Sequence, residues 1–311
     1  MISECAIESE VMAHWEHFFG LHADFGVGQG KLLCEFPNSW RGIVTERVHE
    51  LAESGVNTPM QTKLILEQID IYNPGAFLRA LVPSLRKFKK DSNWCTAARE
   101  IHPEFDLLIH LAEPESEKEF KAGEFIKTSG KYVTPRQDEI QRKAEVLIDC
   151  GWQLYRRAGE IYVIDPYFTP DESRTFGSVL SELLDRVKHN GRKPKRIEVH
   201  TKLPPVYYPD TQKGNWKRWA EKAKVPEDWP ITVVHWDKLE TGSEMHARYI
   251  LTNFGGLDYN WGTDEDPKDY TQVSLLDDLF WQKMYYRFAW TADTIPQVFR
   301  DHPDRVFEVP R

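Results

Sequence analysis

Apolar runs of strand length alternate with segments of helical periodicity through the second half of this 311-residue chain. Three runs, each ending at a proline or a polar residue, are predicted strands, at 160–165, 196–201 and 231–236. Two intervening segments, 171–189 and 215–224, repeat apolar residues every three or four positions and are predicted helices. Strands separated by helices predict a sheet with helix-covered faces, so we expect an α/β fold here.

The first half of the chain has a different pattern. Its periodic segments are predicted helices, at 39–54, 58–71 and 75–90. Strands are predicted only at 31–37 and 105–112, where short apolar runs meet proline or charged residues. This half is therefore expected to be mainly helical, with a few strands.

A charged stretch at 113–134 lacks clear periodicity and is the predicted junction between two domains. Pro135, with Thr134 as N-cap, is predicted to begin a long helix. We therefore expect a mainly helical (α+β) N-terminal domain at 1–130, of unknown role, and an α/β domain at 131–311. Beyond a fifth predicted strand at 257–261, two more segments are predicted helices, at 273–289 and 294–300.

Composition favours a soluble protein, with 41% hydrophobic and 29% charged residues. The chain has no run of 18 apolar residues and no secretory pattern at its N-terminus. Its four cysteines are widely spaced, which is typical of free thiols in a reducing cytoplasm. We expect a cytoplasmic protein that binds no metal and no cofactor.

Two residues within the predicted strand 244–253 suggest phosphate chemistry. On a strand, His246 and Arg248 would project from one face, because side chains alternate with period two. An imidazole can attack or protonate a phosphate, and a guanidinium can neutralise it. The alternative is a strand-end histidine and an arginine that pairs with a nearby acid such as Glu244.

The order of short motifs around this pair resembles phospholipase D-like domains. Those domains carry His-x-Lys-x4-Asp and then a Gly-Ser-x-Asn turn, where this chain has His246-x-Arg248-x4-Asn253 and then Gly262-Thr263. Upstream, a predicted strand ends in Asp165-Pro166-Tyr167. Closest in motif order is the C-terminal phospholipase D-like domain of MIT-domain-containing proteins, and the resemblance covers residues 135–285.

The resemblance implies metal-independent phosphodiester transfer, in which one histidine attacks phosphorus and a second protonates the leaving group. His246 would be nucleophile or general acid, Arg248 would hold the phosphate, and Asn253 would orient the histidine. The chain has one good copy of the motif, so an active enzyme would pair two His246 residues across a homodimer. Two departures weaken catalysis: Arg248 replaces lysine, and Asn253 replaces an aspartate that would stabilise an imidazolium.

Other residues at predicted strand ends are candidate phosphate or ligand contacts, namely Asp165, Tyr167, Lys202, Gly262 and Thr263. Asp165 would lie at the carboxyl end of its strand, where α/β sheets place ligands. The alternative for Asp165 is a helix cap. His200-Thr201-Lys202 repeats the His-x-Lys spacing, which is either coincidence or a phosphate contact.

A basic surface is predicted from residues 191–224, which hold ten Lys or Arg against three acids although the net charge of the chain is −9. Trp216 and Trp219 share a face of the predicted helix there. Basic, aromatic surfaces suit phosphate backbones or membrane interfaces, whereas the alternative is a packed Trp face beside solvated cations. The cations of this patch are Arg192, Lys193, Lys195, Arg196, Lys217 and Arg218.

The leading hypothesis is a phosphodiester-recognising phospholipase D-like protein, with nucleic acid as the favoured ligand and phosphodiesterase or nuclease activity as its enzymatic form. The alternative is a non-catalytic module that docks a protein partner, nucleic acid or anionic lipid. Related modules occur in bacterial antiphage systems, so a third hypothesis is a defence subunit whose N-terminal domain binds partners. Catalytic activity, ligand identity and oligomeric state stay open at this point.

Overall fold

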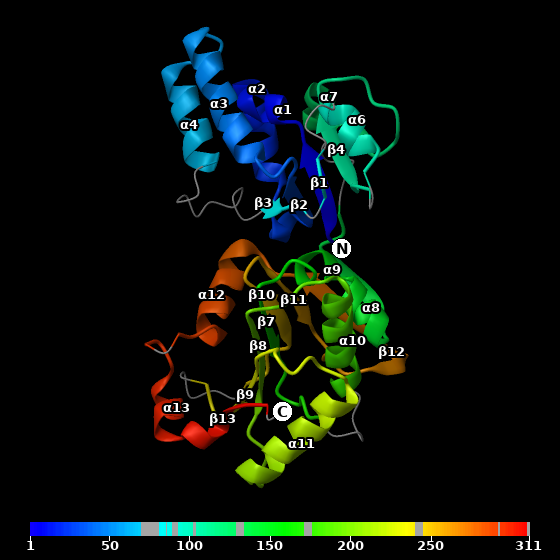
Figure 1. The fold of residues 1–311 in the computed structure, drawn as a ribbon, viewed down its shortest axis with the longest axis vertical. Coiled ribbons are helices and arrows are strands. Elements are labelled where there is room, and N and C mark those ends of the chain that lie inside the picture. The colour runs from blue at the N-terminus through cyan, green and yellow to red at the C-terminus, as the bar shows by residue number, and fades with distance from the viewer. Residues whose placement is uncertain are drawn as a thin grey trace. The chain divides into compact units, whose positions relative to one another are not determined.

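The computed structural model describes residues 1–69, 81–84, 86–88, 93–101, 104–128, 134–170, 176–239, 245–291 and 293–309. The chain divides into two compact units, Met1–Arg136 and Gln137–Arg311 (Figure 1). Each unit has its own sheet and its own apolar core. Among the described residues, no helix is both long and apolar enough to cross a membrane.

The N-terminal unit is built on a five-stranded parallel sheet with the order β3-β2-β1-β4-β5. Strands β1, β2 and β4 are buried along almost their whole length, as expected when helices cover both faces of a parallel sheet. The strands are β1 (Ser3–Ile7), β2 (Lys31–Glu35), β3 (Leu81–Pro83), β4 (Leu107–His110) and β5 (Glu119–Lys121).

Helices of this unit pack their apolar faces against the sheet. In α3 the buried residues Trp40, Val44, Val48 and Leu51 recur at helical spacing and join the core of this unit. The described helices are α1 (Ser9–Ala13), α2 (Trp15–Leu21), α3 (Trp40–Glu53), α4 (Pro59–Ile69), α6 (Trp94–Arg99) and α7 (Ala122–Thr128), with short turns η1 (His22–Asp24) and η2 (Val27–Gln29).

Among the described residues of this unit helices outweigh strands, as the sequence predicted, but the strands form a five-stranded parallel sheet that was not predicted. Leu81–Pro83 forms the edge strand β3 within the predicted helix 75–90, whose residues 75–80, 85 and 89–90 lie outside the described part of the chain. Periodicity cannot separate so short an apolar strand from a helix, and proline is tolerated on a sheet edge. The predicted junction 113–134 contains β5 and α7.

The C-terminal unit is built on an eight-stranded mixed sheet with the order β13-β9-β8-β7-β10-β11-β12-β6. β7, β8 and β9 are parallel, and every other neighbouring pair is antiparallel. The strands are β6 (Gln137–Arg142), β7 (Glu160–Ile164), β8 (Arg196–Lys202), β9 (Ile231–Trp236), β10 (Tyr249–Thr252), β11 (Gly256–Tyr259), β12 (Asp266–Leu275) and β13 (Val306–Glu308). The predicted α/β class is confirmed.

Helices cover both faces of this sheet (Figure 1). Helix α12 packs on one face, where Trp281 and Met284 meet Tyr162, Trp236 and Leu251 in the core. Helices α8, α10 and α11 lie on the other side of the sheet (Figure 1). The helices are α8 (Ala144–Asp149), α9 (Trp152–Tyr155), α10 (Phe176–His189), α11 (Pro209–Lys222), α12 (Asp278–Phe288) and α13 (Gln297–Asp301), with the turn η4 (Pro303–Arg305).

The prediction of a long helix that begins at Pro135 is wrong. Residues Gln137–Arg142 form the edge strand β6, which pairs with β12. β12 also includes residues 273–275, which the sequence assigned to a helix. β6 and residues 266–270 of β12 are mostly solvent-exposed, so these parts lack the apolar alternation that identifies a half-buried strand. Only residues 271–275 of β12 alternate between buried and partly buried positions.

Candidate functional site

One edge of the eight-stranded sheet brings several predicted site residues together. Asp165 directly follows β7, Arg248 directly precedes β10, and Gly262 and Thr263 follow β11. Because β10 is antiparallel to both β7 and β11, the end of β7, the start of β10 and the end of β11 lie at the same edge. We call this edge, with the loops that border it, the β7–β10–β11 edge.

Asp165 organises this edge from a fully buried position. Its Oδ2 accepts hydrogen bonds from the backbone N–H and the hydroxyl of Thr263, both at 3.0 Å. Its Oδ1 accepts the backbone N–H of Tyr167 at 2.9 Å. Burial raises the pKa of this carboxyl, and the hydrogen bonds and nearby Arg248 only partly oppose that effect. Asp165 therefore ties the two loops together.

Arg248 is held by contacts from both loops. Its Nη1 donates to the backbone oxygen of Asn260 at 3.0 Å, and its guanidinium lies 5.4 Å from the centre of the Tyr167 ring. Asp258 is close enough for its charge to interact with Arg248, although burial raises the pKa of that carboxyl. Among the described residues, no hydrogen-bond partner occupies Nη2 or Nε of this half-buried side chain.

Gly262 is needed where the loop after β11 turns. Its φ of 116° is a backbone conformation that L side chains rarely adopt. A Cβ there would lie 2.8 Å from Oδ1 of Asp264 and 3.7 Å from Cδ of Arg248. Glycine is therefore favoured here by the backbone conformation, and the new contact with Asp264 adds to the strain of any substitution.

His246 differs from its predicted position because strand β10 begins only at Tyr249. The histidine lies in the segment before the strand, so strand alternation does not fix it on the face of Arg248. Its side chain is exposed and has no hydrogen-bond partner in the described part of the chain. Neither a general-base partner nor an orienting carboxylate contacts this imidazole there.

Asn253 lies at the opposite end of β10. Its Oδ1 accepts the backbone N–H groups of Gly159 at 2.9 Å and Glu160 at 3.2 Å, at the start of β7. Arg248 and Asn253 are five positions apart along the strand, which is about 16 Å at roughly 3.3 Å per residue. The predicted role of orienting His246 is therefore incompatible with this position.

His200 and Lys202, the two residues of the second His-x-Lys sequence, lie in different environments. His200 is fully buried, with Nε2 3.0 Å from Glu198 Oε2 and with Nδ1 accepting the indole N–H of Trp236 at 3.1 Å. Both ring nitrogens are used, so His200 cannot serve as a second catalytic histidine. Lys202 ends β8, and its backbone N–H donates to Pro166 at 3.2 Å, which places it near the β7–β10–β11 edge.

The predicted basic surface does not join this edge. Arg192, Lys193, Lys195 and Arg196 surround the start of β8, at the opposite end of the parallel strands from Asp165. Two of these cations are already paired, since Lys193 lies 2.6 Å from Asp228 and Arg196 lies 2.7 Å from Glu198.

The aromatic part of that surface lies in the core. On α11, Trp216 and Trp219 are buried, and the Trp216 ring stacks on Phe168 with centroids 5.6 Å apart. The alternative, in which this Trp face packs in the interior, agrees with the structure. Lys217 is half-buried and Arg218 is exposed on the same helix.

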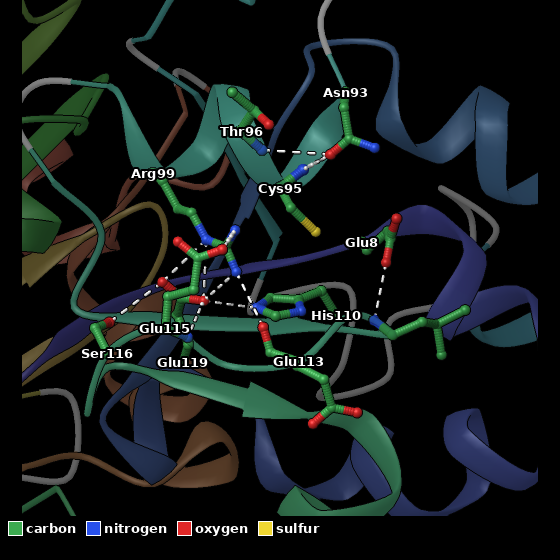
Figure 2. Close-up of polar contacts among 11 residues, drawn as sticks. Glu8, Asn93, Cys95, Thr96, Arg99, His110, Glu113, Glu115, Ser116 and Glu119 are labelled. Atoms are coloured by element: carbon green, nitrogen blue, oxygen red, sulfur yellow. Dashed lines mark hydrogen bonds and ion pairs between the residues drawn. The ribbon is translucent and has the colours of Figure 1, made fainter.

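Sequence reasoning missed a polar cluster in the N-terminal unit (Figure 2). Glu8 directly follows β1 and accepts the backbone N–H of Leu111 at 3.0 Å, joining the carboxyl ends of β1 and β4. Fully buried His110 places Nε2 3.1 Å from Glu119. The strand order reverses between β1 and β4, where parallel sheets commonly bind ligands.

Hydrogen bonds and burial determine which side chains of this cluster are charged. Burial alone would raise the pKa of Glu119, but hydrogen bonds, led by those from Arg99, lower it to about 2. Burial and the charge of Glu8 raise the pKa of the Cys95 thiol to about 11, so it stays protonated at neutral pH. No group of three metal ligands occurs among the residues that the structure describes.

Comparison with known proteins gives only distant likenesses. No family model matches the chain, and no curated protein is significantly similar to it. One similar solved structure is TrmBL2, an archaeal chromatin protein described as showing a novel mode of DNA binding, with a TM-score of 0.27 and 11% identity over 60% of each chain. Another is phosphatidylserine synthase of Haemophilus influenzae, with a TM-score of 0.31 and 12% identity over 63% of this chain and 48% of that one. Each match spans less than two thirds of the other chain, and both are too distant to assign a family or a function.

Proposed function

We propose that the C-terminal unit is a phosphodiester-binding module of phospholipase D-like type, in which Arg248 neutralises the phosphate. The proposal rests on the burial and the hydrogen bonding of the Arg248 guanidinium. It is half-buried and fixed by Asn260 and Tyr167, while Nε and Nη2 have no hydrogen-bond partner among the described residues. A preorganised guanidinium suits two parallel hydrogen bonds to phosphate oxygens, and partial burial strengthens them.

The other predicted contacts support Arg248 indirectly. Thr263 uses its hydroxyl and its backbone N–H on Asp165, so it fixes the loop after β11. Tyr167 uses its backbone N–H on the same carboxylate and keeps its ring exposed beside the cation. Asp165, Gly262 and Thr263 therefore shape the site, while Arg248 and Tyr167 present groups to a ligand.

Phosphodiesterase activity would require a second histidine in addition to His246. The imidazole of His246 would attack phosphorus, forming an N–P bond as the bond to the leaving oxygen breaks. A second histidine would protonate that oxygen, and water would then hydrolyse the N–P bond. Because His200 is buried and fully hydrogen-bonded, the second histidine would be His246 of another copy. The alternative is a monomeric module that binds a phosphodiester without turnover.

Equilibrium binding of a labelled oligonucleotide, with chelator present, tests the proposal. Hydrogen bonds to charged groups contribute about 1.5–3 kcal/mol each, so Arg248→Gln is expected to weaken binding at least about tenfold. Arg300→Gln is the matched control, because it removes an exposed arginine of α13 that belongs neither to this edge nor to the predicted basic patch, and it should leave affinity unchanged. Equal affinity of wild type and Arg248→Gln would refute the phosphate site.

Turnover of bis(p-nitrophenyl) phosphate, measured beside sedimentation, separates the two forms of the proposal. Loss of turnover in His246→Ala, together with a wild-type dimer, supports the enzyme. Binding without turnover supports the non-catalytic module. The antiphage role rests on the sequence resemblance alone, and phage plating on cells that express wild type or Arg248→Gln tests it.

A further inference from the structure

Large apolar side chains are exposed in the loops around Arg248. Tyr167 is 49% exposed and Trp261 is 67% exposed. Exposed tryptophan is unusual on a soluble surface unless it contacts a ligand or partner. Two more exposed side chains, Val206 and Tyr208, lie in the loop that follows β8.

These side chains border a single edge of the sheet. Tyr167 follows β7, Arg248 precedes β10, and Trp261 follows β11, and the three strands are consecutive in the sheet. Neighbouring strands lie about 4.8 Å apart, so the three positions span roughly 10 Å. The loop with Tyr208 extends the row beyond β8, whose last residue is Lys202. Arg248 therefore lies between Tyr167 and Trp261 in the order of the strands.

Hydrogen bonds anchor the backbone at Tyr167 and Trp261. Tyr167 donates its N–H to Asp165 at 2.9 Å, and Trp261 donates its N–H to Thr271 Oγ1 at 3.2 Å. Asn260, directly before Trp261, accepts the hydrogen bond from Arg248. Anchored aromatic residues lose little conformational entropy when a ligand binds, because only two side-chain torsions need to be ordered.

We infer that the phosphodiester bound by Arg248 belongs to a single-stranded nucleic acid, whose bases stack on Trp261 and Tyr167. This inference rests on the proposed phosphate site and adds the class of ligand. Sites for single strands combine cations along the backbone with aromatic rings under the bases, and every base offers a face for stacking. Bases within a duplex are already stacked on each other and cannot offer that face.

A membrane surface fits this edge less well. Anionic lipid headgroups attract clusters of Lys and Arg, whereas the cluster predicted at 192–196 surrounds the opposite end of the strands. One cation between two rings instead suits one phosphate between two bases.

The test compares two labelled strands of about 16 nucleotides, one of thymidines and one with the same backbone but abasic sites. The two strands share their phosphates and differ only in bases, so fluorescence anisotropy separates stacking from charge. Wild type is expected to bind the thymidine strand more tightly than the abasic strand. Trp261→Ala is expected to weaken thymidine binding by about 5- to 150-fold and to leave abasic binding unchanged.

Two further variants test whether the effect on binding depends on an aromatic ring and on the position of that ring. Trp261→Phe keeps an aromatic face and should retain most of the affinity. Tyr286→Ala removes a tyrosine that is 69% exposed on α12, next to Tyr285, which contacts Glu160 at the start of β7. That position lies at the other end of the strand, so thymidine binding should not change.

The outcomes separate this inference from the proposed function. Equal wild-type affinity for the two strands, unaltered in Trp261→Ala, would overturn base stacking and leave the phosphate site standing. Binding of neither strand would overturn both. Tighter binding to phosphatidylserine vesicles than to the thymidine strand would overturn the inference in favour of a lipid headgroup.

Discussion

Removing the Asp165 carboxylate should loosen the β7–β10–β11 edge, because that group accepts three hydrogen bonds from two loops. Asp165→Ala leaves the backbone N–H groups of Tyr167 and Thr263 without their acceptor. A buried polar group without a partner costs about 1–3 kcal/mol, so two such groups cost about 2–6 kcal/mol. The substitution also removes a carboxylate whose burial is unfavourable, as its raised pKa shows, and this offsets part of the cost. We therefore expect the free energy of unfolding to fall by about 3 kcal/mol.

Asp165→Asn provides the internal comparison. One orientation of the amide keeps its oxygen toward both donors of Thr263 and loses only the bond from Tyr167. The expected cost is therefore smaller, about 1–2 kcal/mol. Urea unfolding at pH 7, followed by tryptophan fluorescence, gives both values. Costs below about 0.5 kcal/mol for Asp165→Ala, or an equal cost for the two variants, would refute the assignment of Asp165 as the tie between the loops.

Three further predictions concern other positions. Gly262→Ala should destabilise the C-terminal unit by about 1–3 kcal/mol in urea, because φ is 116° and the new Cβ would meet Asp264; an unchanged midpoint would contradict the turn described. The pKa of Glu119 is about 2 in the folded chain and 4.5 as the ordinary value, so its stabilising contribution is present above pH 4.5 and is lost as pH falls toward 2. Glu119→Gln should therefore flatten the acid limb of a stability–pH curve, and a limb as steep as that of wild type would argue against the pairing with Arg99. His246→Ala should leave the unfolding midpoint unchanged, because the side chain is exposed and makes no described contact, and a shift would show a structural role.

The sequence predicted the parts of the fold that are buried. β7, β8 and β9 are apolar runs between helices, and all three lie within a residue of the predicted positions. The edge strand β6 and the exposed first half of β12 were missed because an exposed strand needs no apolar alternation. In the N-terminal unit, β2 and β4 lie within the strands predicted at 31–37 and 105–112, whereas β1, β3 and β5 were missed. β3 and β5 are only three residues long, which leaves little pattern to read.

The sequence named candidate residues that the structure brings to one edge, but it did not reveal how they contact one another. Asp165, Arg248 and Thr263 meet at one edge, as the order of motifs suggested. The tie between Asp165 and Thr263 joins residues 98 positions apart, which spacing cannot reveal. Asn253 was misjudged because the four residues after Arg248 form a complete strand that carries it away.

The central claim is that Arg248 contacts a phosphate, and the salt dependence of binding measures this directly. On a single strand, each neutralised phosphate adds about −0.7 to the slope of log affinity against log salt concentration. Arg248→Gln should make that slope shallower by about 0.7 than the slope of wild type, while Arg300→Gln keeps it. An unchanged slope in Arg248→Gln, even with weaker binding, would contradict the account.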